Sequence, residues 1–188
     1  MGILKKKKLL TVTILLMITF LFVVTGCSKT SKDIEKYLNT GSGIDAPAKQ
    51  MMPTLDQLPV YEKIEYRYTK KTMLFFQSHS VALIVNYDEQ TFENENEKLA
   101  ENFTFSTMTS ATTDEASTPD YQFVINSYTF KIVDENEFPK SFGMIGTSDK
   151  EQSIAYLYFY DFDLDSIGEE DNSNPMPEFV NDYFNYDF

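Results

Sequence analysis

The chain has 188 residues with 16 basic and 29 acidic side chains, which give a formal net charge of −13. Aromatic residues make up 15% of it, enough apolar area for one hydrophobic core even though Trp is absent. A chain this acidic is repelled by phosphate backbones and by anionic lipid head groups, so its composition excludes nucleic-acid binding.

Residues 1–26 are predicted to be a secretory leader. The lysines Lys5 to Lys8 come first, an apolar run from Leu9 to Val24 follows, and small residues come next. This order is typical of a signal peptide. The apolar run is shorter than the roughly 20 residues of a spanning helix, so a retained membrane span is the less favoured alternative.

The end of the leader, Val24-Thr25-Gly26-Cys27, resembles the lipobox of bacterial lipoproteins. The resemblance covers the leader alone. It implies cleavage between Gly26 and Cys27 and attachment of diacylglycerol to Cys27, which would hold the protein on the extracytoplasmic face of the cell membrane. Cys27 is also the only cysteine, so it has no disulfide partner within the chain. Loss of the four leader lysines leaves 12 basic and 29 acidic residues, a net charge of −17.

Residues 27–59 are expected to form a polar tether. Gly, Ser and Pro in NTGSGIDAPAKQMMP interrupt any periodicity. A flexible segment of ~20 residues spans roughly 25 Å, which would lift a domain off the head groups. The alternative is an extended arm in which Met51-Met52-Pro53 and Leu55 to Leu58 pack on the domain that follows.

Residues 60–188 are predicted to form one α+β domain. Alternation in IEYRYT and the β-branched and aromatic residues of MLFFQSHSVALIVNYD predict two strands, with a polar turn over Gln77 to Ser80. Asp88 is expected to cap a helix in EQTFENENEKLAENF, since Phe92, Leu99 and Phe103 fall on one helical face.

A Ser/Thr-rich loop is expected from Ser106 to Pro119, and three strands and a helix after it. The strands are YQFVINSYTFKIVD, SFGMIG and SIAYLYFYDFDLD, and the helix begins near Pro177. In the first of these strands, Phe123 and Ile125 are expected to face away from Tyr128 and Phe130. The order ββ-α-βββ-α favours an antiparallel sheet with its helices packed on one face.

No catalytic motif is recognisable. His79 is the only histidine, and its neighbours Ser78 and Ser80 point to the opposite face of an extended chain, so neither forms a Ser-His pair with it. The sequence after Cys27 has no further cysteine to bind zinc, and it has no glycine-rich loop to bind phosphate. We therefore expect no enzyme activity, no cofactor and no metal centre.

The stretch AYLYFYDFDLDSIGEED has partial calcium-loop spacing. Asp161, Asp163 and Asp165 lie at i, i+2 and i+4, but Ser166 takes the place of the turning Gly and Asn172 that of the bidentate Glu. The favoured interpretation is a strand that leaves the core, with its last aspartates in water.

Two alternatives for this stretch stay open. One is a weak cation site that adds three more acidic residues, and the other is a strip that binds a partner. The additional residues are Glu169, Glu170 and Asp171.

The sequence as a whole favours a lipid-anchored, extracytoplasmic domain at the cell surface that binds a ligand or partner without catalysis. Its expected partners are the membrane, through Cys27, and an unidentified protein, peptide or small ligand. The alternatives are a surface hydrolase using a carboxylate pair and a calcium-stabilised structural domain.

Overall fold

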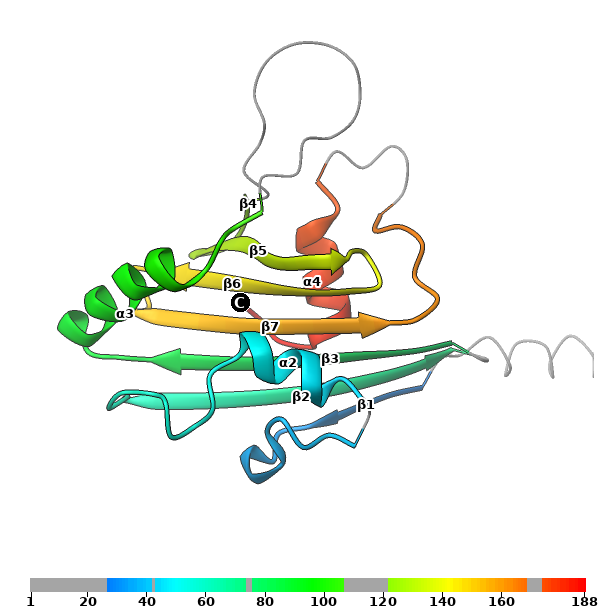
Figure 1. Ribbon diagram of the computed structural model, residues 1–188, viewed down its shortest axis with the longest axis horizontal. Coiled ribbons are helices and arrows are strands. Elements are labelled where there is room, and N and C mark those ends of the chain that lie inside the picture. The colour runs from blue at the N-terminus through cyan, green and yellow to red at the C-terminus, as the bar shows by residue number, and fades with distance from the viewer. Residues whose placement is uncertain (1–26, 42, 74–75, 107–121, 169–173) are drawn as a thin grey trace, which may run out of the picture.

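The computed structural model describes residues 27–41, 43–73, 76–106, 122–168 and 174–188. One seven-stranded antiparallel sheet, in the order β1-β2-β3-β7-β6-β5-β4, forms its framework (Figure 1). The strands are β1 (Cys27–Ser31), β2 (Lys63–Met73), β3 (Phe76–Asn86), β4 (Gln122–Ile125), β5 (Tyr128–Glu137), β6 (Ser141–Ser148) and β7 (Ser153–Asp161). The helices are the 3₁₀ turn η1 (Ile34–Lys36), α2 (Asp45–Met51), α3 (Glu89–Asn102) and α4 (Met176–Phe184). The predicted α+β class and antiparallel sheet are confirmed.

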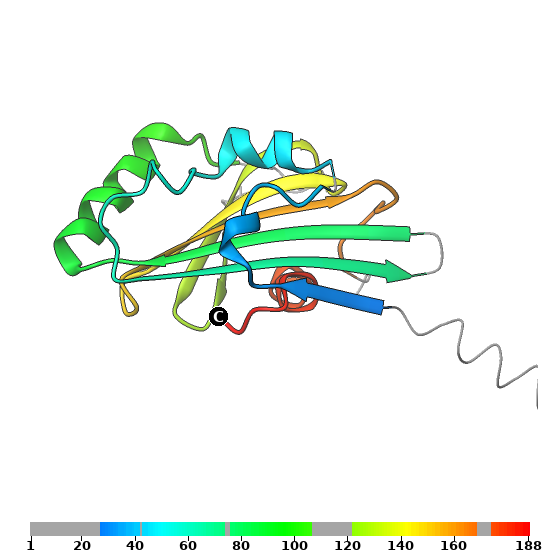
Figure 2. The same cartoon turned by 90° about the horizontal axis from the view of Figure 1, so that it is seen from below.

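Helices cover both faces of this sheet, so the expected one-sided packing is wrong. In Figure 2, α2 and α3 lie on one side and α4 lies on the other. The cause is the sequence of the central strand β3, in which Leu83 belongs to the core cluster under α2 and α3 while Ile84 belongs to the cluster under α4. A strand that is apolar on both faces needs a cover on each.

The local signals for α3 and α4 are confirmed. The Asp88 side chain caps α3 by accepting the Thr91 backbone N–H at 3.0 Å, and Phe92 and Leu99 are buried beneath the helix. A proline lies in the first turn of α4, and the helix buries side chains including Phe179.

The predicted tether over residues 27–59 is wrong for the part that the structure describes. Cys27 opens β1 and lies opposite Thr72 of β2, so pairing with the sheet begins at the first described residue. Tyr37, Leu38 and Ile44 are at most 5% exposed, in the cluster under α2 and α3. These apolar side chains have no regular spacing, so they show no periodicity, yet burying each of them is favourable. The alternative of a packed arm is closer to the structure.

The turn expected over Gln77 to Ser80 is also wrong, because these residues belong to β3. Their polar groups find partners on both faces of the sheet. The Tyr68 hydroxyl lies 2.8 Å from His79 Nδ1 on one face, and Ser80 donates to the Tyr183 carbonyl at 2.5 Å on the other. Partners from elsewhere in the chain thus allow a polar stretch to continue a strand.

YQFVINSYTFKIVD forms two strands instead of one. Asn126, at a φ of 51°, and Ser127 form a two-residue connection, and Ile125 lies opposite Tyr128. Opposed residues in a hairpin share a face, so Ile125 and Tyr128 are buried in the same cluster and do not face opposite ways.

SIAYLYFYD forms a strand as predicted, and its side chains alternate between the two faces of the sheet. Tyr156 and Tyr158 belong to one core cluster, and Leu157 and Phe159 belong to the other. The strand does not run on to Asp165, however. It ends at Asp161, which is only 8% exposed and therefore not in water as expected.

Candidate functional site

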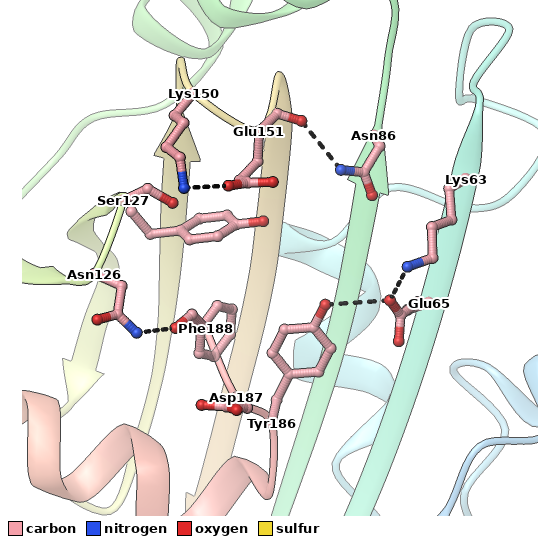
Figure 3. Close-up of a pocket in the computed structure, with 11 residues that line it drawn as sticks. Lys63, Glu65, Asn86, Asn126, Ser127, Lys150, Glu151, Tyr186, Asp187 and Phe188 are labelled. Atoms are coloured by element: carbon pink, nitrogen blue, oxygen red, sulfur yellow. Dashed lines mark hydrogen bonds and ion pairs between the residues drawn. The ribbon is translucent and has the colours of Figure 1, made fainter.

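A cavity of about 700 Å³ opens at the end of the sheet where β2 begins and β3 ends (Figure 3). We call it the distal pocket because Cys27 lies at the other end of the strands. Its volume falls within the range of roughly 300–1,000 Å³ that is usual for ligand sites. The lining residues are Lys63, Glu65, Asn86, Asn126, Ser127, Tyr128, Lys150, Glu151, Tyr186, Asp187 and Phe188.

Five segments that are distant in the sequence supply these residues. They are the start of β2, the end of β3, the β4–β5 turn with the start of β5, the β6–β7 turn, and the segment after α4. The antiparallel order of the strands places these ends together, and the Asn86 side chain joins two of them by donating to the Glu151 carbonyl at 3.1 Å.

Ion pairs set the electrostatics of the distal pocket. Lys63 lies 2.7 Å from Glu65 on one side, and Lys150 lies 3.1 Å from Glu151 on the other. The Lys63 ammonium lowers the pKa of Glu65 by hydrogen bonding to its carboxylate, and Arg67 lies 3.2 Å from the same group. Glu65 is therefore ionised at neutral pH, and each lysine has an acidic neighbour.

Aromatic rings form one wall of the pocket. The Tyr186 and Phe188 ring centroids are 4.6 Å apart, and those of Tyr128 and Phe188 are 5.3 Å apart. Tyr186 donates to Glu65 at 3.3 Å, and the Asn126 side chain donates to the main-chain oxygen of Phe188. Burial raises the pKa of both tyrosines, so their hydroxyls stay protonated and available as donors.

These groups suit a small ligand that has both an apolar part and charged ends. A strongly anionic ligand would face Glu65, Glu151 and Asp187, and a strongly cationic one would face the two lysines. The lowered pKa of Glu65 suits this carboxyl to an ionised role and not to that of a general acid.

A second cavity, of about 270 Å³, lies beside Cys27. Asp161 lines it, and burial raises the pKa of this carboxyl, which accepts the Asp163 backbone N–H at 3.0 Å. Lys71 lines the same cavity, with Nζ 4.5 Å from the centroid of the Tyr183 ring.

The aspartates of the predicted cation strip do not come together. Asp161 is buried, Asp163 is exposed, and Asp165 lies 3.6 Å from Lys140. Within the described ranges, no three His, Cys, Asp or Glu side chains are grouped as metal ligands. The remaining residues proposed for this strip, Glu169, Glu170 and Asp171, lie outside the described residues.

Cys27 is exposed at the start of β1. Residues 1–26, including Gly26 and the rest of the lipobox, lie outside the described residues, so signal cleavage and lipid attachment stay predictions. Among the helices that the structure describes, none has the length and apolar character to cross a membrane.

His79 is buried at 6% exposure between two tyrosine rings, with centroids 6.1 Å from Tyr68 and 6.4 Å from Tyr160. Burial, helped by the nearby Lys70 charge, lowers its pKa, so the ring is neutral at pH 7. Ser78 and Ser80 lie on the other face of β3, as alternation predicts. The histidine packs as part of the core, and neither of these two serines is placed to act as its nucleophile.

Comparison with protein-family models, curated proteins and solved structures gives no match to this chain. The functional interpretation therefore rests on the geometry above. Sequence reasoning missed the distal pocket altogether, and the one local signal for it was Asn126-Ser127, a turn between two apolar runs.

Proposed function

We propose that this protein is a lipid-anchored, extracytoplasmic binding domain that acts without catalysis and takes its ligand in the distal pocket. The observation that carries the proposal is the position of the pocket. It lies at the opposite end of the strands from Cys27, the residue that the lipobox marks for lipid attachment. β2 has 11 residues, so the two ends are roughly 35 Å apart and an anchored domain holds the pocket toward the surroundings.

The ligand class that fits the pocket is a short peptide or a similar zwitterion. Lys63 and Lys150 can each pair with a carboxylate of the ligand. Glu65, Glu151 and Asp187 can each pair with an ammonium group of the ligand. The neutral aromatic wall takes the apolar part of the ligand. A ligand with both charges can exchange partners with the existing ion pairs and leave no charge buried alone.

The anchoring half of the proposal is tested by mass spectrometry of the full chain purified from the membrane of a bacterial expression host. We expect the mature chain to begin at Cys27 and to carry the mass of diacylglycerol on that residue. An uncleaved chain, or a mature chain with an unmodified Cys27, would overturn the lipid anchor.

The binding half is tested with residues 27–188 carrying Cys27→Ser, titrated with free tripeptides Ala-X-Ala and followed by amide chemical shifts. We expect saturable shifts at Asn126, Ser127 and Glu151, and none with the same peptides acetylated and amidated.

Lys63→Ala should weaken binding by about tenfold or more, because a charge-assisted hydrogen bond is lost. Lys98→Ala, an exposed lysine on α3, is the matched control and should change nothing. Shifts confined to another surface, or no shifts with any peptide, would contradict the proposed site.

A further inference from the structure

One rim of the sheet gathers Cys27 and the ends of the three neighbouring strands. Cys27 lies opposite Thr72 near the end of β2, and Phe76 begins β3. Asp161, the last residue of β7, pairs with Ser78, so β7 ends at the same rim, on the right in Figure 1. We define the Cys27 rim as residues 27–29, 70–72, 76–78 and 161–162.

Two large aromatic side chains of this rim are in water. Phe76 is 48% exposed and Phe162, directly after β7, is 69% exposed. Phe76 lines the cavity beside Cys27 with Ser78 and Asp161, and Phe162 directly follows Asp161, so both residues lie at the same rim. Lys140 stands beside Phe162, with Nζ 5.8 Å from the ring centroid and 3.6 Å from the Asp165 carboxylate. Phenylalanine and lysine side chains together are found on segments that lie in the lipid head-group layer.

The charge of β1 and of the adjoining ends of β2 and β3 is opposite to that of the whole chain. Residues 27–31, 68–73 and 76–80 contain three lysines, Lys29, Lys70 and Lys71, and no acidic residue, although the chain has 29 acidic side chains. Lys29 lies directly opposite Lys70 in the β1–β2 register. Two like charges in this position repel each other, and an anion bound between them relieves the repulsion.

We propose that the Cys27 rim rests on the membrane, with Phe76 and Phe162 in the head-group layer and the three lysines against the phosphates of anionic phospholipids. The inference rests on the proposed lipid at Cys27. Because β1 begins at Cys27, no spacer separates the attached lipid from the rim. The carboxylates of the distal pocket are roughly 35 Å away, well beyond the Debye length of ~10 Å at 0.1 M salt, so they do not act at the rim. The acidic residues at the end of β7 are Asp161, which is buried, and the exposed Asp163 and Asp165, of which Asp165 lies 3.6 Å from Lys140.

The absence of Trp from the chain allows a direct test. Phe76→Trp, Phe162→Trp and Val60→Trp each give a single fluorophore, and Val60, which is 85% exposed just before β2, is the matched control at the far end. The full lipidated chain is reconstituted into vesicles of phosphatidylcholine and phosphatidylglycerol that carry brominated acyl chains. The emission of the Phe76→Trp and Phe162→Trp variants should shift to the blue and be quenched, while that of Val60→Trp is unaffected. Equal quenching of all three variants, or of none, would overturn the inference.

The role of the lysines is tested without the lipid anchor. Residues 27–188 with Cys27→Ser are sedimented with phosphatidylglycerol vesicles and with phosphatidylcholine vesicles. We expect binding to the anionic vesicles only, weakened by Lys70→Glu and Lys71→Glu by about fivefold or more for each lysine and unchanged by Lys49→Glu on α2. Thermal unfolding of every variant confirms that it is folded.

This second measurement separates the two proposals. If mass spectrometry finds no lipid on Cys27 while the lysine-dependent binding persists, the anchor is wrong and the membrane-facing rim stands. If Cys27 is lipidated while the lysine variants bind vesicles as the parent chain does and the Trp variants are not quenched, the anchor stands and the rim proposal is wrong.

Discussion

Individual side chains in this protein take their properties from partners that are remote in the sequence. Asp161 shows this most directly. It has the spacing of a calcium ligand in the sequence, but it lies at the end of β7, where burial beside the second cavity raises the pKa of its carboxyl. The acidic residue thus marks a boundary of the core, and its charge is a cost to stability at neutral pH.

Asp161→Asn should therefore raise the melting temperature at pH 7. The folded pKa of Asp161 lies above its unfolded value of 3.8, so the native state binds more protons in the window above 3.8 and its stability falls as pH rises through it. Asn keeps the acceptor for the Asp163 N–H and carries no charge. The gain in melting temperature should shrink as pH falls toward 4, because more of the wild-type carboxyl becomes protonated.

Differential scanning calorimetry at pH 7 and pH 4 measures this difference. Asp149→Asn is the control, because Asp149 is exposed in the turn between β6 and β7 and its neutralisation should leave the melting temperature nearly unchanged. An Asp161→Asn chain that is less stable than wild type at pH 7 would show that the carboxylate is held by a favourable contact.

Elements with weak local signals in the sequence complete the core of the domain. The segment before β2 has the composition of a tether, yet β1 extends the sheet and α2 covers part of its face in Figure 1. α4 covers part of the other face of the sheet with Phe179 and Phe184. Residues 174–188 therefore supply part of the core, and their deletion should destabilise the whole domain.

Ile44→Ala should lower the free energy of unfolding by about 2–5 kcal/mol, because Ile44 is 1% exposed and its loss leaves a cavity under the sheet. Lys49→Ala, on an exposed face of α2, should change it by less than about 0.5 kcal/mol. Urea denaturation of residues 27–188 with Cys27→Ser measures both values. If the two variants are equally stable, Ile44 does not contribute to the core and residues 27–59 act as a tether after all.

The whole molecule has two distinct ends joined by long antiparallel strands. One end carries Cys27, exposed phenylalanines and a local group of lysines. The other end carries the distal pocket with its paired charges (Figure 3). The net charge of −13 does not give the local charge at either end of the molecule, because acidic and basic residues are distributed unevenly along the strands. The proposed orientation on the membrane follows from this polarity.

Lysine acetylation by a membrane-impermeant reagent should report this orientation. In vesicles that carry the lipidated chain, Lys29 and Lys71 should react several times more slowly than in detergent, because head groups cover them. Lys63 and Lys150, at the distal pocket, should react at the same rate in both. Peptide mass spectrometry reads each site separately, and protection of the pocket lysines instead would mean that the domain is anchored the other way round.

Much of the secondary structure was predictable from local sequence. The Asp88 cap, the apolar face of α3, the proline at the start of α4 and the two faces of β7 all depend on neighbours a few residues away. Such signals are either residues at a helix terminus or apolar residues with the period of a helix or strand, so they can be recognised without knowledge of the tertiary structure. The errors fell on segments whose structure depends on remote partners, such as residues 27–59 and the polar stretch around His79.

Three properties follow from the sequence without any structure: the acidic composition, the α+β class and the resemblance of Val24 to Cys27 to a lipobox. The folded chain alone reveals that Cys27 begins a strand, that both faces of the sheet are covered, and that Lys63, Asn126 and Lys150 line one pocket. The physical reason is that a pocket is formed by strand ends and turns that antiparallel pairing brings together. Each of these segments has an ordinary local sequence, and their common position is fixed by the register of the whole sheet.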